Sequence, residues 1–256
     1  MPRRALRLAG GLVVAALLAA ACSSTDLAAK AGPNGTIFDF PGHPTAAQRD
    51  ADLHVMQHRA AALGGSAELV DGHLIVRVPG GRTVALRLSV EGHVGFRPVE
   101  AQYTASGSST PAITPAAQLQ PDAAAVMTSY ASGQGQATVY RVGPEGLSNT
   151  AIDSATADEG QDGTWEVRPV LKPGATGIDR FNGLAAVCAG TDPRCPTHQV
   201  SLSVDAVVLA APTVQSASFA RDAITISGNF TEPQARALAA VMGAGELATP
   251  ILPTQK

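Results

Sequence analysis

The sequence predicts an α+β fold, and three observations lead to this prediction. A helix that begins at Thr45 leads into a hairpin of two strands at 67–78. A second pair of strands at 199–209 is followed by a third strand, which is expected to end at Gly228-Asn229, and then by a helix that begins at Thr231. Both helices begin with Thr-x-x-Gln, the pattern of a capping box. Because helices and sheets each bury one apolar face, we expect helices packed on one face of a mixed or antiparallel sheet.

Residues 1–21 are predicted to be a targeting segment rather than part of the folded domain. Three arginines precede an apolar run at 8–18, which is shorter than the roughly 20 residues that a membrane-spanning helix needs. Removing this segment takes away three arginines and no acids, so the 18 basic and 21 acidic residues of the chain become a net charge of −6. An acidic surface without a basic cluster argues against nucleic acid as a partner.

Cys22 follows this segment directly, after three alanines and before two serines. The arrangement resembles a bacterial lipoprotein signal, which implies cleavage before Cys22 and acyl chains such as palmitate attached there. Each buried methylene contributes roughly 0.8 kcal/mol, so two or three acyl chains hold a small domain at a membrane. The alternative is ordinary signal-peptidase cleavage, which would leave Cys22 without a role.

The two remaining cysteines, Cys188 and Cys195, are predicted to form a structural disulfide. They are separated by six residues, and an exported protein is exposed to oxidising conditions. In the chain-entropy model, closing such a small ring contributes about 2.5 kcal/mol. The spacing matches neither a zinc site with a second ligand pair nor a redox Cys-x-x-Cys motif.

In chain order, a tether at 22–44 precedes a first unit at 45–100. The region 101–125 is rich in serine and proline and poor in large apolar residues, so it is predicted to be a flexible loop. A second unit at 126–256 then carries the remaining elements. Its strands are expected at 138–142, 150–155, 165–171, 199–204 and 207–209, with helices at 178–187 and from Thr231 onward.

This order resembles the first extracytoplasmic domain of SecD or SecDF, the accessory subunit of bacterial protein export. The head subdomain is matched by Val204-Asp205, Val207, Ala211-Pro212, 224–232, Ala235, Leu238-Ala239 and 245–250. The base subdomain is matched by the helix and hairpin, Pro79-Gly80-Gly81 and the strand 95–99. The resemblance implies a ferredoxin-like base lobe at 45–100 and a SecDF head lobe at 126–256. It also favours a helix at 82–90, where the alternating apolar residues would equally suit a strand.

No catalytic, cofactor or metal site is predicted. His54 and His58 stand four apart on one helix, but the glutamate of a metalloprotease is missing, so a solvated helix flank is expected. No Gly-x-Ser-x-Gly elbow and no Walker lysine occur, and Asp205 is interpreted as a turn residue.

The resemblance therefore implies a non-enzymatic, lipid-anchored binding module on the extracytoplasmic face of the cell membrane. Its partners would be exported polypeptide or subunits of the Sec translocase. Strand addition at an exposed edge around Val204, Val207 and Leu209 is one way to hold an extended chain. The first alternative is a structural envelope lipoprotein that keeps the fold without an export role. The second is an enzyme whose site a single sequence does not reveal.

Overall fold

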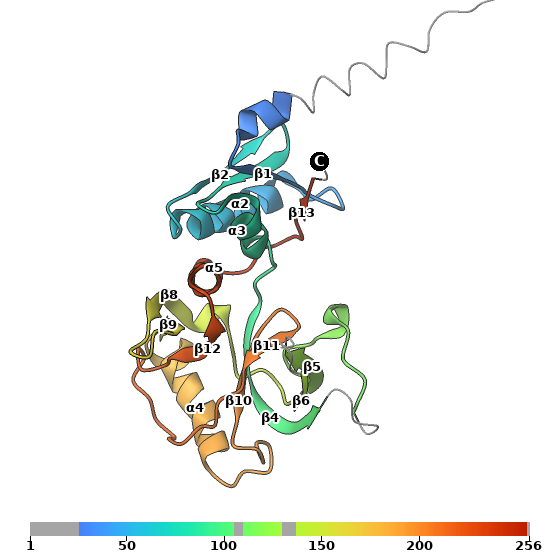
Figure 1. Cartoon of the computed structure of the whole chain (residues 1–256). Coiled ribbons are helices and arrows are strands. Elements are labelled where there is room, and N and C mark those ends of the chain that lie inside the picture. Colours follow the sequence, from blue (N-terminus) through green and yellow to red (C-terminus); the bar gives the residue numbers. More distant parts are fainter. Residues whose placement is uncertain (1–25, 105–109, 130–136, 255–256) are drawn as a thin grey trace, which may run out of the picture.

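Two lobes make up the described part of the chain (Figure 1). The computed structural model describes residues 26–104, 110–129 and 137–254, so the predicted targeting segment and Cys22 lie outside it. Helices and sheets are mixed throughout, which confirms the α+β prediction. We call the lobe that holds the first strands and the last strand the base lobe, and the other the head lobe.

The base lobe is a four-stranded antiparallel sheet with two helices on one face. Its strands lie in the order β13-β1-β3-β2, and each neighbouring pair is antiparallel. This order, with α2 after β1 and α3 after β3, confirms the ferredoxin-like prediction. The elements are β1 (Gly35–Asp39), α2 (Ala46–Ala61), β2 (Ser66–Val70), β3 (His73–Arg77), α3 (Gly81–Leu88) and β13 (Leu252–Pro253).

Local chemistry sets most of these elements. The side chain of Thr45 accepts from the backbone N–H of Gln48, whose own side chain accepts from the backbone of Thr45, so α2 begins at the predicted capping box. Asp71 and Gly72 turn β2 into β3 with positive φ angles of 53° and 84°. The segment at 82–90, for which a helix was favoured, is largely helical as α3.

The tether predicted at 22–44 is wrong over much of its length. β1 lies inside it and pairs with β3, with Phe38 fully buried beneath the helices. A helical segment at 26–31 covers the opposite face of the sheet, where Leu27 and Ala31 pack against Ile75. The helical segment at 26–31 and β1 are short and lie close to glycines and a proline, so the local sequence does not indicate them. Their stability comes from packing against β3, more than 30 residues along the chain.

In the head lobe, five strands close into a small barrel. β4 pairs with β10 along its first half and with β6 along its second, while β11 joins β10 to β5 and β5 joins β6. The short β7 adds to the free side of β4. These elements are β4 (Val94–Thr104), β5 (Ala125–Ser129), β6 (Thr138–Val142), β7 (Leu147–Ser148), β10 (Val200–Val204) and β11 (Val207–Ala210).

A separate three-stranded antiparallel sheet, in the order β12-β9-β8, completes the head lobe with two helices. α5 packs along β8 and β9, and α4 packs beside β4 and β10. The elements are β8 (Ile152–Glu159), β9 (Trp165–Leu171), α4 (Ile178–Ala189), β12 (Ile226–Phe230) and α5 (Glu232–Ala244). Single 3₁₀ turns occur at Ala116–Gln118, Asn149–Ala151 and Gly174–Thr176.

Three sequence interpretations need correction here. The segment 95–99 was expected to end the base unit, but it lies in β4 and belongs to the barrel. The loop predicted at 101–125 is shorter, because 101–104 continue β4 against β6. The third strand was expected to end at Gly228 and Asn229, but both residues lie within β12, where the pairing to β9 shifts register. In each case cross-strand pairing outweighs the local composition.

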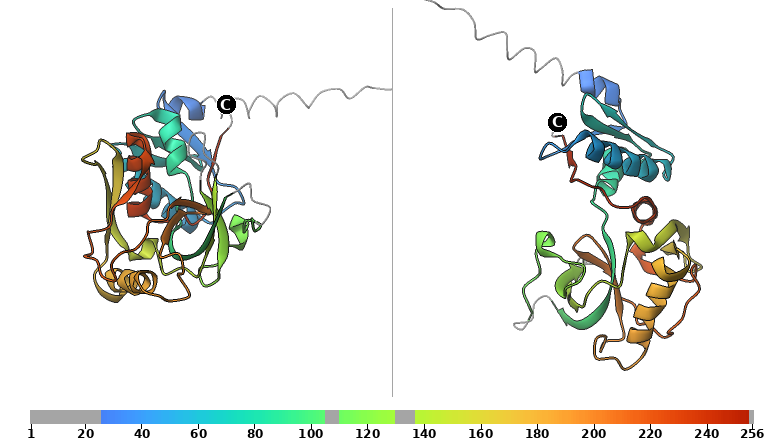
Figure 2. Two further views of the ribbon diagram at one scale, coloured as in Figure 1. Left: turned by 60° about the horizontal axis from the view of Figure 1, so that its bottom comes forward. Right: turned by 180° about the vertical axis from the view of Figure 1, so that it is seen from behind.

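α5 lies between the two lobes (Figure 2). Ala235, Ala239 and Met242 belong to the core of the head lobe. On the neighbouring face, Ala237 and Val241 belong to the core of the base lobe. Because most of these side chains are alanines, both lobes approach the helix closely. The head lobe is thus an insertion between α3 and β13, packed back onto the base lobe through α5.

The chain crosses between the lobes twice, and Arg59 on α2 binds both crossings. Its fully buried guanidinium donates to the carbonyls of Leu88, Val90 and Glu91 on the outgoing crossing, at 2.6, 2.6 and 2.9 Å. It also donates to the carbonyl of Gly245 on the returning crossing, at 2.5 Å. One side chain therefore donates to backbone carbonyls of both crossings, and the carbonyl of Glu91 also accepts from the backbone N–H of Leu247.

Two further residues fit around this arrangement. Asp52, two turns before Arg59 along α2, accepts from the backbone N–H of Ala248 at 2.6 Å and from the hydroxyl of Thr249 at 2.5 Å. Gly92 has a φ of +83°, and a Cβ atom there would lie 2.4 Å from a guanidinium nitrogen of Arg59. Only glycine fits at that position.

We expect Arg59→Met to destabilise the protein strongly, because methionine fills part of the space but removes the donor from the carbonyls of Leu88, Val90 and Gly245. The carbonyl of Glu91 would keep the backbone N–H of Leu247 as its donor. Each unsatisfied buried group costs about 1–3 kcal/mol, so a loss of at least about 3 kcal/mol is expected. Urea unfolding curves measure it. The matched control, Arg82→Met on the exposed side of α3, should change the free energy of unfolding by about 0.5 kcal/mol or less. Equal effects of the two substitutions would contradict the role of Arg59.

Candidate functional site

The head lobe contains an apolar cleft of about 590 Å³. Two segments, 209–214 and 223–227, line it from the end of β11 and the start of β12. Three aromatic rings line it as well, Phe96 from β4, Phe181 from α4 and Phe219 from the intervening loop. Phe181 makes edge-to-face contacts with both other rings, at centroid distances of 5.9 and 5.6 Å. The cleft therefore has rigid aromatic walls and suits apolar groups.

The loop that carries Phe219 is held by side chains of the head lobe. Asn182 on α4 accepts from the backbone N–H of Phe219 at 2.9 Å and donates to its carbonyl at 3.3 Å. Arg221 donates to the carbonyl of Leu171 on β9 at 2.9 Å and pairs with Asp153 at 2.6 Å. These bonds hold the loop that carries Phe219 to α4 and β9.

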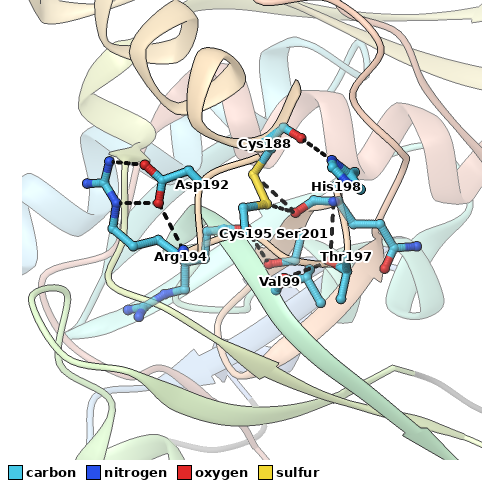
Figure 3. Close-up of a disulfide and its surroundings, with 10 residues drawn as sticks. Val99, Cys188, Asp192, Arg194, Cys195, Thr197, His198 and Ser201 are labelled. Atoms are coloured by element: carbon cyan, nitrogen blue, oxygen red, sulfur yellow. Dashed lines mark hydrogen bonds and ion pairs between the residues drawn. A yellow bond between two sulfur atoms is a disulfide. The ribbon is translucent and has the colours of Figure 1, made fainter. Parts of the chain in front are cut away.

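A disulfide joins Cys188, near the end of α4, to Cys195 (Figure 3). Both cysteines are buried in the head core, and both sulfur atoms lie beside the carbonyl of Gln199, which precedes β10. His198 donates through Nδ1 to the carbonyl of Cys188 at 2.9 Å, and Thr197 donates to the carbonyl of Val99 on β4 at 2.6 Å. The bridge thus fastens α4, and with it one wall of the cleft, to the barrel.

The short disulfide loop has its own ion pair. Arg194 contacts Asp192 through its guanidinium at 2.7 Å and through its backbone N–H at 2.9 Å. The side-chain hydrogen bond from Arg194 is the main reason that the pKa of Asp192 falls to about 2. Arg194 is exposed and Asp192 is partly exposed, so the pair shapes the loop and adds little stability.

A second feature is a polar cavity of about 390 Å³ where the two crossings meet the barrel. We give the name junction cluster to His93, Arg97, Glu145, Asp205 and Glu246, charged residues that line this cavity. His93, immediately before β4, faces Glu145 through Nε2 at 2.9 Å and Glu246 through Nδ1 at 3.0 Å. Arg97 lies 3.6 Å from the same oxygen of Glu145. The carboxylate of Asp205 accepts from the backbone N–H groups of Gly92 and His93, each at 2.9 Å.

These contacts shift the pKa values of the cluster. The hydrogen bond to Glu145 is the largest cause that raises the pKa of His93, to about 9, and the bond to Glu246 adds to it. Burial lowers the pKa of Arg97, although Glu145 opposes the effect. Burial likewise lowers the pKa of Arg59 to about 10.

A scan against protein-family models matches residues 124–249 to the SecDF P1 head subdomain. Residues 124–249 belong to the SecDF P1 head family. The matched range begins just before β5 and ends after α5, so it contains both segments that line the cleft, 209–214 and 223–227, and the disulfide.

Two solved structures extend the likeness to both lobes. SecDF in its super-membrane-facing form aligns with 86% of this chain at a TM-score of 0.57 and 17% identity, and the match covers 29% of that SecDF chain. A structure described as SecDF, a membrane component that enhances protein export, aligns with 87% of this chain and 98% of its own, at a TM-score of 0.55 and 17% identity. These likenesses show a shared fold. A search of curated proteins found no matching sequence.

The edge predicted at Val204, Val207 and Leu209 of the SecDF head is not an open edge. β10 is paired with β4 and β11, and β11 is paired with β10 and β5, because the barrel closes around them. The three side chains instead line a small cavity of about 250 Å³ against α5. Asp205 is the turn residue expected, with a φ of +54°. The open edge that borders the cleft belongs to β12, which pairs only with β9 among the described strands.

The described residues include no group of three or more His, Cys, Asp or Glu side chains placed to hold a metal ion. His54 and His58 are exposed on α2, with ring centroids 4.5 Å apart. Among the helices that the structure describes, none is long and apolar enough to cross a membrane.

The junction cluster was missed at the sequence level. His93, Glu145 and Glu246 come from three separate parts of the chain, and each stands beside a glycine as an ordinary loop residue would. Arg59 resembled any charged residue of an amphipathic helix. A weak signal existed, because Arg59 falls three residues after Met56 and next to Ala60, on the apolar side of α2.

We expect replacement of both cysteines, Cys188→Ala with Cys195→Ala, to lower the free energy of unfolding by about 2.5 kcal/mol through the larger entropy of the unfolded chain. Urea unfolding of the oxidised protein and of the double variant measures the difference. Addition of a reductant in urea should bring the native protein close to the variant and leave the variant unchanged. A variant as stable as the oxidised protein would show that the bridge does not stabilise the head.

Proposed function

We propose that this chain is a non-enzymatic accessory module of protein export, anchored by lipid at Cys22 on the extracytoplasmic face of the membrane. In this proposal the head cleft holds a short apolar stretch of an exported polypeptide. The observation that carries the proposal is the aromatic-lined cleft, whose lining apart from Phe96 lies in the segment that belongs to the SecDF P1 head family. A SecDF with the same fold is described as enhancing protein export.

The shape of the cleft supports an extended segment as its occupant. Ile226 and Ser227 on β12 line it, and this edge of β12 has no partner strand among the described residues. A polypeptide in extended form can add to such an edge through its backbone, and alternate side chains then enter the cleft. No sequence-specific polar contact is needed, which suits a module that meets many different substrates.

The expected affinity is modest. Full burial of one large apolar side chain contributes about 1.5–3 kcal/mol, and a cleft of this size accepts one or two such side chains. Association itself costs several kcal/mol, so the complex should be weak and short-lived. Weak holding favours a module that delays backward movement of a chain and then releases it.

The same fold would also serve a structural envelope lipoprotein without an export role. The two functions differ in what enters the cleft. Export accessory function requires binding of unfolded polypeptide, and a purely structural role does not.

We expect Thr225→Arg to weaken polypeptide binding at least tenfold, because Thr225 lines the cleft and is exposed. A long charged side chain there would occupy the cleft without disturbing the buried core. The measurement is fluorescence anisotropy of a labelled, unfolded peptide with alternating apolar residues, titrated with the protein.

The matched control is Thr156→Arg, which places the same change on the exposed face of β8, away from the cleft. It should bind like the unaltered protein. If neither the unaltered protein nor the control binds the peptide, the export proposal fails and the structural alternative gains support. Equal weakening by both substitutions would mean that the peptide binds outside the cleft.

We expect Cys22→Ala to move the protein from the membrane fraction to the soluble fraction, because the acyl chains would have no attachment point. Fractionation of cells, together with metabolic labelling by a palmitate analogue, measures this. Cys188→Ala with Cys195→Ala provides the control, which should remain labelled and bound to the membrane. A Cys22→Ala protein that stays in the membrane fraction would contradict lipid anchoring.

A further inference from the structure

We propose that His93 is a proton-dependent clamp of the two lobes, which as an imidazolium holds Glu145 and Glu246 together and loosens the junction when it loses its proton. The proposal goes beyond polypeptide binding, because it concerns how the lobes are held rather than what the cleft takes. It stands on the geometry of the junction cluster.

The hydrogen-bonding capacity of imidazole carries the argument. A carboxylate only accepts hydrogen bonds, and a neutral imidazole has one N–H donor and one acceptor nitrogen. His93 has a carboxylate oxygen at 2.9 Å from Nε2 and another at 3.0 Å from Nδ1. Only the protonated ring donates to both carboxylates. Loss of the proton would leave a lone pair facing a carboxylate, so one of the two contacts must open.

The carboxylates of Glu145 and Glu246 come from different parts of the chain, and both parts lie where the two lobes are joined. His93 ends the outgoing crossing, and Glu246 lies on the returning crossing beside Leu247, a residue of the base core. Glu145 belongs to the loop between β6 and β7 of the barrel and is almost fully buried, with 6% of its side chain exposed. The imidazolium therefore links both crossings to the head barrel at one point.

The charges around the ring favour its protonated form. Besides Glu145 and Glu246, the carboxylate of Asp205 binds the backbone N–H of His93, and Glu91 lines the same cavity. The cations nearby are Arg97, which contacts Glu145, and Arg59, whose charge interacts with Asp205 and Glu246. The four carboxylates outnumber the two guanidinium groups, in agreement with the raised pKa of His93.

The direction of the pH effect follows from linkage. The pKa of His93 is about 9 in the closed junction and 6.5 in its ordinary state. The clamp is therefore fully effective below pH 6.5 and is lost as the pH rises through about 9. Between these limits, opening the junction releases one proton from the His93 ring to water, and closing takes one up. The equilibrium constant for opening should rise about tenfold per pH unit in that interval.

The first measurement is an NMR titration of the histidine ring carbons in the full chain, carried in detergent micelles. The signal lost in His93→Gln identifies His93. We expect it to titrate near pH 9 in the unaltered protein, and at least one unit lower in Glu246→Gln, which keeps an acceptor but removes the charge. A His93 that titrates near pH 6.5, or one that does not respond to Glu246→Gln, would overturn the proposal.

The second measurement separates a clamp from a merely structural histidine. Amide hydrogen exchange at 88–92 and 245–249, corrected for the intrinsic dependence on pH, should accelerate about tenfold per pH unit between pH 7 and 9 in the unaltered protein. In His93→Gln the corrected rates should be faster and independent of pH. His43→Gln, on an exposed loop of the base lobe, should behave like the unaltered protein. Corrected rates that do not depend on pH in the unaltered protein would refute the clamp.

Discussion

The structure depends on the buried guanidinium of Arg59 more than on any other single group. An inserted lobe requires two chain crossings, and the backbone carbonyls of these crossings lie outside the hydrogen bonding of helices and strands. Arg59 donates to four of them, three on the way out and one on the way back. Burying a charge is costly, as the lowered pKa of Arg59 shows. The cost is offset because a guanidinium offers five donors in a fixed plane, which no neutral side chain does.

The base lobe and the head lobe each have their own core, and α5 contributes side chains to both cores. α5 supplies Ala235 and Ala239 to one core and Ala237 and Val241 to the other. The junction cluster lies beside it, where the barrel meets both crossings. A movement of one lobe relative to the other would have to disturb Arg59, α5 and His93 together. The same contacts that stabilise the fold therefore decide how freely the head can turn.

The cleft is stabilised independently of that junction. Asn182, Arg221 and the disulfide all act within the head lobe, and they hold the walls of the cleft against the barrel and β9. A change at the lobe junction would therefore reposition the cleft without deforming it. Separate stabilisation of the junction and the cleft suits a binding module that changes its orientation with the conditions but keeps its binding surface unchanged.

By itself, the sequence determined the parts of this protein whose signals are local. The capping boxes at Thr45 and Thr231, the Asp71-Gly72 turn and the closely spaced cysteine pair each involve residues within a few positions of one another. Only the tertiary structure decided the rest: β1 and β13 in the base sheet, the closed barrel that removes the edge at Val207, and the junction itself. Arg59 meets Gly245 across 186 positions of the chain and His93 meets Glu246 across 153. No local pattern of residues encodes such a meeting, because it exists only after both lobes have folded and packed around α5.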